Sequence, residues 1–241
     1  MSTPLYNILE KHSPDFHPVV PFNAKKDKLL PLDFTAANTT LTADILSDTH
    51  VFANYVNRLL ETRYTYGIGG YNEHRTIYAR SIVFDTAEEP RRLHLGIDIW
   101  GPANTPIFAP LDGYVHSFAF NEHYGDYGAT IILQHELDRT SFNTLYGHLS
   151  LKDLVGLYEG QHISAGAEFA HFGEPNENGQ WPPHLHFQIV QEMYENKGDY
   201  PGVCRFSERE KFLANSPDPD VILQMMQYTI TTANQRRFNE D

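Results

Sequence analysis

The sequence predicts a mainly β protein, and three observations support this. Six segments between residues 77 and 190 have the apolar and β-branched composition of strands. Glycine and proline punctuate them as at turns, for example at Gly101-Pro102 and Asp112-Gly113. Helical spacing of apolar residues appears only in the flanking segments. We therefore expect an all-β core with helical extensions at both ends.

The predicted strands are 77–83, 94–99, 113–120, 130–134, 144–148 and 184–190. Before them, residues 1–40 contain five prolines and predict an extended arm with one helical turn at most. Apolar residues recur at helical spacing over 48–63, where Ser47 or Asp48 is suited to cap the helix. After Cys204 we expect helices at 207–214 and 219–228, followed by a polar, frayed tail.

This pattern divides the chain into three segments. Residues 1–75 form an N-terminal arm and helix, 76–204 a β-rich domain, and 205–241 a C-terminal helical segment and tail. The sequence contains no internal repeat and no low-complexity stretch.

Charge and composition exclude some classes of partner. The formal net charge of −13 disfavours binding to phosphate backbones, so we expect no nucleic-acid partner. No stretch approaches the roughly 18 apolar residues of a membrane span, and no secretory signal is recognisable. The single cysteine, Cys204, cannot form an intrachain disulfide. We expect a cytoplasmic protein, and its oligomeric state is left open.

Two short motifs carry candidate metal ligands. On a strand, His94, Gly96 and Asp98 of His94-Leu95-Gly96-Ile97-Asp98 point to one side, and Gly96 leaves space between a nitrogen and an oxygen ligand. In His184-Leu185-His186-Phe187, both imidazoles share one face, and either one or both can bind an ion. A hydrogen-bonded surface pair is the alternative for His94 and Asp98.

Two histidines and one carboxylate are typical of a catalytic zinc site, which keeps one position open for water. Zinc lowers the pKa of a bound water and polarises a carbonyl. Hydrolysis then needs groups that move protons and stabilise an oxyanion, and His148 and His184 are the candidates. A packed turn residue is the alternative for His148.

These motifs resemble the lysostaphin-type (LytM-like) zinc metallopeptidase family over roughly residues 90–190. HLGID at 94–98, LYGHLS at 145–150 and PPHLHFQI at 182–189 occur in the order of that family. The resemblance implies an antiparallel β-sheet groove with Zn²⁺ held by His94, Asp98 and His186. It also implies that His148 and His184 are the catalytic histidines, and that the substrate is a peptide of the bacterial cell wall (peptidoglycan).

Some features depart from the family pattern. The segment GEPNENGQWPP places Asn176, Asn178, Gln180 and Trp181 at the expected groove edge. Gln188 stands where members often carry glutamate, and we expect it to support a ligand rather than bind metal. Trp181 is equally suited to a substrate platform and to a core position. In the polar cluster at 71–75, His74 is the residue to watch for a role in the groove, although a solvated loop is the favoured interpretation.

The first functional hypothesis is an endopeptidase-like zinc hydrolase. The second is a zinc- and ligand-binding regulatory module without hydrolysis, and a related one is a hydrolase of a different cytoplasmic peptide or amide. A further hypothesis is an intact hydrolase blocked by residues 1–75 lying in the groove.

Overall fold

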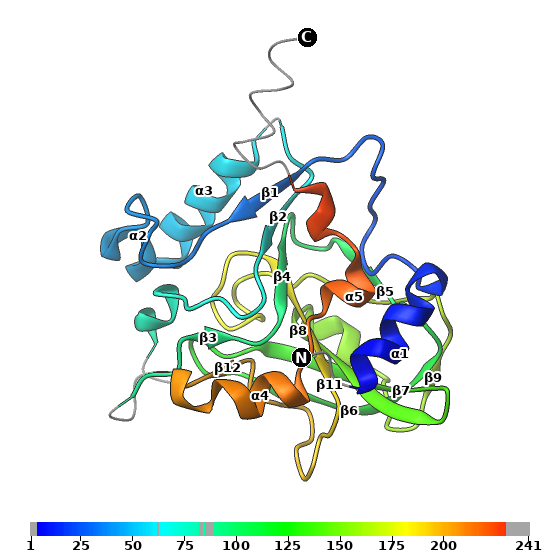
Figure 1. The fold of residues 1–241 in the computed structure, drawn as a ribbon. Helices are drawn as coiled ribbons and strands as arrows, with labels where there is room; N and C mark the ends of the chain where they lie inside the picture. The colour runs from blue at the N-terminus through cyan, green and yellow to red at the C-terminus, as the bar shows by residue number, and fades with distance from the viewer. Residues whose placement is uncertain (1–3, 62, 82–83, 85–88, 230–241) are drawn as a thin grey trace.

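An eight-stranded sheet lies at the centre of the computed structural model, which describes residues 4–61, 63–81, 84 and 89–229 (Figure 1). The strand order is β1-β2-β4-β11-β8-β7-β6-β9, and only β1 and β2 pair in parallel. The bounds are Leu29–Leu32 (β1), Tyr66–Gly69 (β2), Ile97–Trp100 (β4), His184–Val190 (β11), Thr140–Leu149 (β8), Gly128–Leu137 (β7), Gly113–Asn121 (β6) and His162–Ile163 (β9). The predicted mainly β fold with an antiparallel sheet is confirmed.

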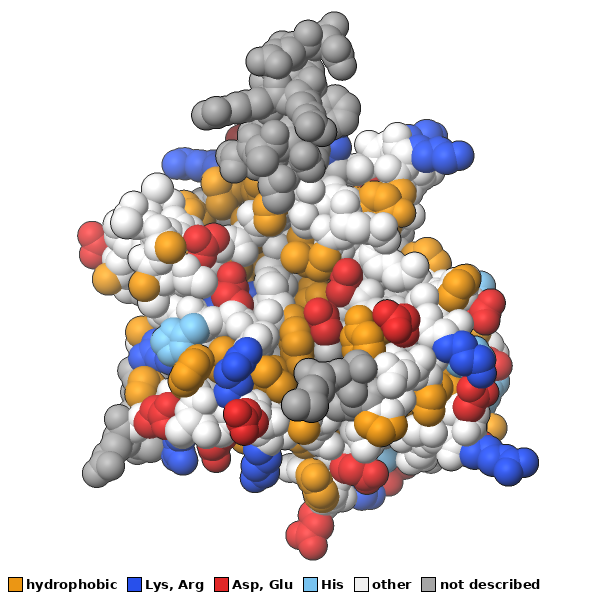
Figure 2. All heavy atoms as spheres, viewed as in Figure 1, with side chains coloured by type: hydrophobic (Ala, Val, Ile, Leu, Met, Phe, Trp, Pro, Cys, Tyr) orange, Lys and Arg blue, Asp and Glu red, His pale blue; other side chains and the backbone are white. Residues whose placement is uncertain are grey.

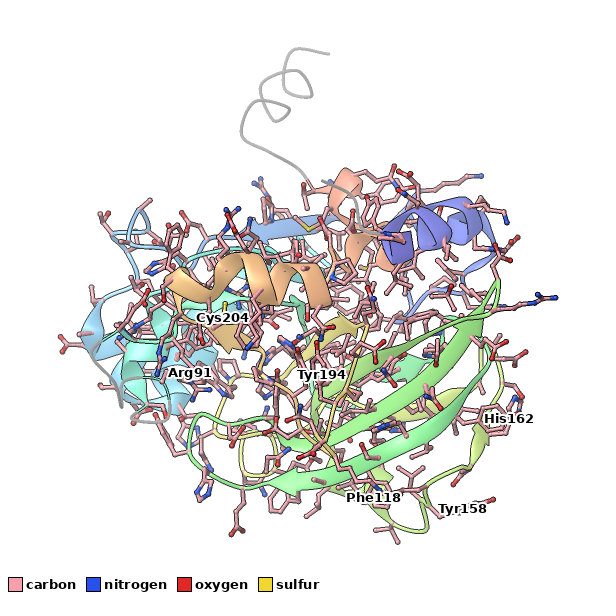
Figure 3. All side chains as sticks on the ribbon, turned by 60° about the horizontal axis from the view of Figure 1, so that its bottom comes forward. Arg91, Phe118, Tyr158, His162, Tyr194 and Cys204 are labelled. Atoms are coloured by element: carbon pink, nitrogen blue, oxygen red, sulfur yellow. The ribbon has the colours of Figure 1, made fainter. Side chains whose placement is uncertain are left out.

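Two pairs of short strands complete the β structure. Strand β5 (Pro106–Phe108) pairs with β10 (Glu168–His171), and β3 (Leu93–His94) pairs with β12 (Val203–Cys204), both antiparallel. Cys204 is buried beneath helix α4 (Arg209–Asn215), against whose Phe212 and Leu213 it packs (Figure 3). The β3–β12 pair thus ties the first metal-site motif to the C-terminal helix.

Alternation along β11 separates the core from the site. Leu185, Phe187 and Ile189 belong to the main apolar core. His184 and His186 point to the opposite face, as expected from the two-residue period of a strand. This strand has the predicted bounds of 184–190, and the predicted strands at 113–120, 130–134 and 144–148 lie within β6, β7 and β8.

One predicted strand is wrong and another is interrupted. The segment 77–83 begins as a 3-10 helix, η2 (Ile77–Arg80), because Ile77 and Tyr78 pack into an apolar cluster that a turn can fill as well as a strand. Residues 82 and 83 lie outside the described residues. The segment 94–99 is divided into β3 and β4, because the Leu95 backbone N–H leaves the sheet and donates to the Gly202 carbonyl.

The helices lie around the sheet (Figure 1). They are α1 (Pro4–His12), α2 (Ala43–Ser47), α3 (Thr49–Leu60), α4, α5 (Asp220–Leu223) and the 3-10 helices η1 (Ser13–Asp15), η2, η3 (Leu151–Leu154), η4 (Phe206–Glu208) and η5 (Met226–Tyr228). The helix predicted at 48–63 corresponds to α3, and the C-terminal helix predictions correspond to η4–α4 and to α5–η5. The expected frayed tail lies outside the described residues.

The expected extended arm at 1–40 is wrong. Helix α1 has nine residues, and its Leu5 and Leu9 are buried in the main core. Strand β1 joins the central sheet through β2. The segment before residue 76 therefore supplies two strands and many core side chains, Leu5 and Leu9 among them. The division of the chain into three segments stays a prediction.

One face of the molecule carries charges of both signs. On the face in Figure 2, Lys and Arg side chains are interspersed with Asp and Glu rather than gathered into one basic patch. Among the described residues, no helix has the length and apolar character needed to cross a membrane.

Candidate metal centre and active site

Three ligand-type atoms converge from three strands. His94 Nε2 lies 3.0 Å from His186 Nδ1 and 3.2 Å from Asp98 Oδ1, and His186 Nδ1 lies 3.0 Å from the same oxygen. In a tetrahedral zinc site with bonds of about 2.0–2.1 Å, neighbouring ligand atoms are about 3.3 Å apart. The spacing of these buried side chains therefore fits a small divalent cation.

Strand register produces this convergence. In the β11–β4 pair, His186 lies directly opposite Asp98. Gly96 is required between the two residues of the first motif, because a Cβ there would lie 2.5 Å from His186 Cε1. The space that the sequence suggested at Gly96 is occupied by the imidazole of His186.

Outer hydrogen bonds assign the tautomers of the two imidazoles. His94 Nδ1 lies 3.1 Å from the Gly70 carbonyl, and His186 Nε2 lies 2.9 Å from Gln188 Oε1. Gln188 Nε2 donates to the Pro201 carbonyl, which fixes the orientation of the amide. Each outer nitrogen therefore donates, and the inner nitrogens present lone pairs to each other and to Asp98, a donor set that suits a cation.

Asp98 is held on its outer side by an arginine. Arg75 is fully buried and donates from Nη1 to Asp98 Oδ2. Burial raises the pKa of the Asp98 carboxyl, but its electrostatic interactions with His94 and Arg75 outweigh burial and hold that pKa well below its usual value. Burial, reinforced by the Arg75 charge, lowers the pKa of His94 to about 4, so His94 is neutral and able to ligate near pH 7.

His148 and His184 form a second pair beside this centre. Their ring centroids are 4.1 Å apart. His148 Nδ1 lies 2.8 Å from the Asn178 carbonyl, and His184 Nδ1 lies 2.7 Å from the Pro182 carbonyl. Because a carbonyl can only accept, Nδ1 of each ring carries the proton, and each Nε2 is left as a proton acceptor.

Burial keeps this second pair neutral. It lowers the pKa of His184 to about 4 and holds the pKa of His148 well below its usual value. The Trp100 ring stacks on His184 with centroids 3.8 Å apart and planes 9° apart, so the orientation of His184 is fixed by packing.

A cavity of about 250 Å³ opens over both groups. Asp98, His148, His184 and His186 line it, whereas His94 lies behind its wall. The structure therefore brings all five sequence-predicted site residues together in one place. Three of them, His94, Asp98 and His186, form the one group of His, Cys, Asp or Glu side chains among the described residues that is close enough to hold a metal ion.

Tyr127 is a cavity residue that sequence reasoning missed. Its hydroxyl lies 3.3 Å from His186 Nε2, and its ring lies against Gly147, where a Cβ would approach it to 2.4 Å. A Cβ at Gly202 would lie 1.8 Å from the hydroxyl. Burial raises the pKa of Tyr127 well above its usual value, so it stays a hydroxyl donor. The only signal in the sequence was its place between Gly125 and Gly128.

The segment before Pro182 is more buried than expected. Trp181 is 3% exposed, lines the cavity and also packs against Phe52, so it occupies a core position beside the cavity. Its role as a substrate platform stays a prediction. Asn178 is fully buried and organises the loop by donating to the Gly173 and Trp181 carbonyls. Asn176 and Gln180 are not part of the cavity lining.

The cluster at 71–75 reaches the site through Arg75 rather than through His74. His74 is exposed and packs near the Phe206 ring. Arg75 reaches Asp98 instead. Residues alternate direction along this extended segment, so only one of these two neighbours can point inward.

The region that contains this site resembles a known protein family. Residues 92–198 match the family model described as Peptidase family M23. This part of the chain is similar to the M23 peptidases. It contains all five sequence-predicted site residues, whereas Gly70 and Arg75 lie outside the matched range.

Several known proteins are similar to parts of the chain. The DD-carboxypeptidase/endopeptidase Mpg of Neisseria meningitidis is 31% identical over 125 residues, which make up 50% of this chain and 26% of Mpg. An uncharacterized metalloprotease of Haemophilus influenzae is 35% identical over 98 residues, 41% of this chain and 18% of that protein. The match thus spans about a quarter or less of these curated relatives.

Among solved structures, the catalytic domain of lysostaphin from Staphylococcus simulans has a TM-score of 0.43 and 22% identity, covering 71% of this chain and 97% of that domain. A protein described as peptidase M23 from Pseudomonas aeruginosa has a TM-score of 0.36 and 22% identity, and the match covers 54% of this chain and 43% of that chain.

Proposed function

We propose that the protein is a zinc-dependent endopeptidase, a hydrolase of peptide or amide bonds. His94, Asp98 and His186 would hold the ion, His94 through Nε2 and His186 through Nδ1. The observation that carries the proposal is that three lone-pair atoms lie within 3.0–3.2 Å of one another, with each imidazole tautomer fixed from outside. Such a cluster of acceptors repels itself unless a cation lies between them.

When bound, zinc would supply a Lewis acid and lower the pKa of water. The protein supplies the proton transfers. Because His148 and His184 are neutral with Nε2 unprotonated, one of them can accept a proton from the attacking water and return it to the leaving amine. The Tyr127 hydroxyl lines the same cavity and is suited to donate to a developing oxyanion. The division of roles between the two histidines stays open.

We propose a peptide of the bacterial cell wall as the substrate class. The support is the family match and the similarity to Mpg, whose name describes a DD-carboxypeptidase/endopeptidase. The cytoplasmic location expected from the sequence stays a prediction, which fractionation of cells containing the full-length protein would test.

Mass spectrometry of purified muropeptides incubated with the protein tests the function. We expect cleavage that a metal chelator abolishes and that His186→Ala removes together with bound zinc. The control is His74→Ala, because His74 is exposed and does not line the cavity. If His186→Ala kept both its zinc and its cleavage rate, the assignment would be wrong.

The hypothesis of a non-hydrolytic zinc-binding module makes a different prediction for the same assay: bound zinc without products from any peptide tested. Hydrolysis of another peptide or amide would appear only with non-wall substrates. The hypothesis of a blocking N-terminal arm has no support in the described structure, where the cavity lining begins at Ile77.

A further inference from the structure

We infer that Arg75 is a positioning residue for the metal site, which holds Asp98 so that only one carboxylate oxygen faces the two imidazoles. This inference rests on the proposed function, because it assumes that Asp98 is a metal ligand. It assigns a role to the segment 69–78, which lies outside the residues that match the peptidase family.

The guanidinium of Arg75 is fixed from several sides. Nη1 donates to Asp98 Oδ2 and lies 3.3 Å from the Tyr78 hydroxyl, and Nε donates to Glu73 Oε2 at 2.6 Å. The Phe34 ring lies against it, 5.4 Å from its central carbon. The side chain is fully buried, so no exchange with water competes for these contacts. Its position is therefore determined by the fold.

A glycine makes room for this arginine. Gly69 of β2 lies directly opposite Asp98 in the β2–β4 pair. A Cβ at Gly69 would lie 2.5 Å from Arg75 Nη2. Only glycine at this position lets the guanidinium reach the carboxylate, so the sheet register and the glycine together build the contact.

The two carboxylate oxygens of Asp98 have different partners. Oδ2 accepts from Arg75, while Oδ1 lies 3.0 Å from His186 Nδ1 and 3.2 Å from His94 Nε2. Rotation of the carboxylate would break the bond to Arg75. Asp98 is thus held to offer a single oxygen toward the imidazoles.

The same segment also supports His94. The Gly70 carbonyl lies 3.1 Å from His94 Nδ1, and the His94 backbone N–H donates to the Glu73 carbonyl at 2.9 Å. Two of the three proposed ligands are therefore oriented by residues 69–75. The third, His186, is oriented by Gln188 from within its own strand.

Arginine suits this role better than lysine. Its planar group donates in two directions at once, here to Asp98 and to Glu73, whereas an ammonium on a flexible stem acts as a point charge. The two possible roles of Arg75, orientation and charge, can therefore be separated by substitution.

The test measures zinc affinity of the full-length protein by competition with a chromophoric chelator, for Arg75→Met, Arg75→Lys and Glu73→Ala. If Arg75 positions Asp98, both Arg75 variants bind zinc roughly 10–100-fold more weakly, the usual loss when an outer partner of a ligand is removed. Glu73→Ala is also expected to weaken zinc binding, because Arg75 loses the carboxylate that accepts from its Nε. Arg205→Met is the matched control, a half-buried arginine outside the cavity lining, and should bind like the wild type.

The sign of the change distinguishes the two roles. If Arg75 acted only through its charge, removing a cation beside the metal would tighten zinc binding in Arg75→Met, and Arg75→Lys would be unchanged. Either result overturns the inference. The visible spectrum of the cobalt-loaded protein gives a second readout, because releasing Asp98 Oδ2 should change the coordination of the ion, whereas a general loss of stability should not.

Failure of the inference is distinguishable from failure of the proposed function. If the wild-type chain binds no zinc, the proposed function fails at the first step. If the wild type binds one zinc ion and both Arg75 variants bind it equally well, only the role of Arg75 is wrong. Should Arg75→Met not fold, the charge-conserving Arg75→Lys and the Glu73→Ala variant still decide the question.

Discussion

At the scale of single residues, the protein buries several neutral histidines. Burial lowers the pKa of His94, His135 and His184 to about 4. In an unfolded chain a histidine titrates near 6.5. Between about pH 6.5 and pH 4 the unfolded protein therefore binds protons that the folded protein does not. These three histidines therefore lower the free energy of unfolding of the metal-free protein as the pH decreases through this window.

His135 allows this effect to be measured away from the metal centre. It lies on β7, where Nδ1 contacts the Asp112 carbonyl and Nε2 contacts Thr144 Oγ1. We expect it to account for up to roughly 3 kcal/mol of the loss on acidification. Urea unfolding of metal-free wild type and His135→Gln at pH 7 and pH 4.5 checks this. The wild type should lose more stability than the variant, and equal losses would contradict the prediction.

The positions of site residues were predictable where they followed the two-residue alternation of a single strand. The alternation of His184 and His186 with Leu185 and Phe187 is a property of one strand, and the structure contains it. Arg75 and Tyr127 were not predictable. The access of Arg75 to Asp98 depends on the missing Cβ of Gly69 and on the pairing of β2 with β4, and the position of Tyr127 depends on the missing Cβ of Gly202, far along the chain. No local pattern encodes such a contact.

At the scale of elements, helix α3 is capped by Asp48 and packs against the wall of the cavity. The Asp48 side chain accepts from the backbone N–H groups of His50 and Val51 at 2.8 and 3.0 Å. Phe52 of α3 is fully buried and packs against Trp100, which in turn stacks on His184. The cap thus stabilises a helix that supports the wall of the site.

Asp48→Ala should lower the free energy of unfolding by about 1 kcal/mol, the usual cost of losing an N-cap. Thermal or urea denaturation of metal-free protein measures it. Asp44→Ala is the control, because Asp44 is exposed in the first turn of α2, where Thr42 is the cap. A loss in Asp48→Ala no larger than in the control would show that the cap does not stabilise α3.

Element prediction succeeded where one signal dominated and failed where long-range pairing decided. The helix over 48–63 combined apolar spacing with a capping residue, and α3 lies within it. The break between β3 and β4 depends on the bond from Leu95 to Gly202, and β1 depends on pairing with β2 more than thirty residues later. A short run such as Leu29–Leu32 contains too little pattern to predict its partner.

At the scale of the whole molecule, the question is whether the N-terminal segment is an appendage or part of the core. Leu9 of α1 is fully buried in the same cluster as Ile97 and Leu185, which lie behind the metal site. Helix α1 also packs on α5, so both ends of the described chain meet over the sheet (Figure 1). A side chain in that position should contribute to the stability of the entire sheet.

Leu9→Ala should therefore destabilise the full-length protein by about 2–5 kcal/mol, the range for a buried leucine in a packed core. The control is Leu59→Ala on α3, where the leucine is 37% exposed and the loss should be far smaller. Denaturation followed by far-UV circular dichroism measures both variants. If the N-terminal segment were a separate arm, Leu9→Ala would leave the main transition unchanged. A lowered midpoint of that single transition would mean that α1 and the metal-bearing strands unfold as one unit, so that removing residues 1–75 would dismantle the site rather than uncover it.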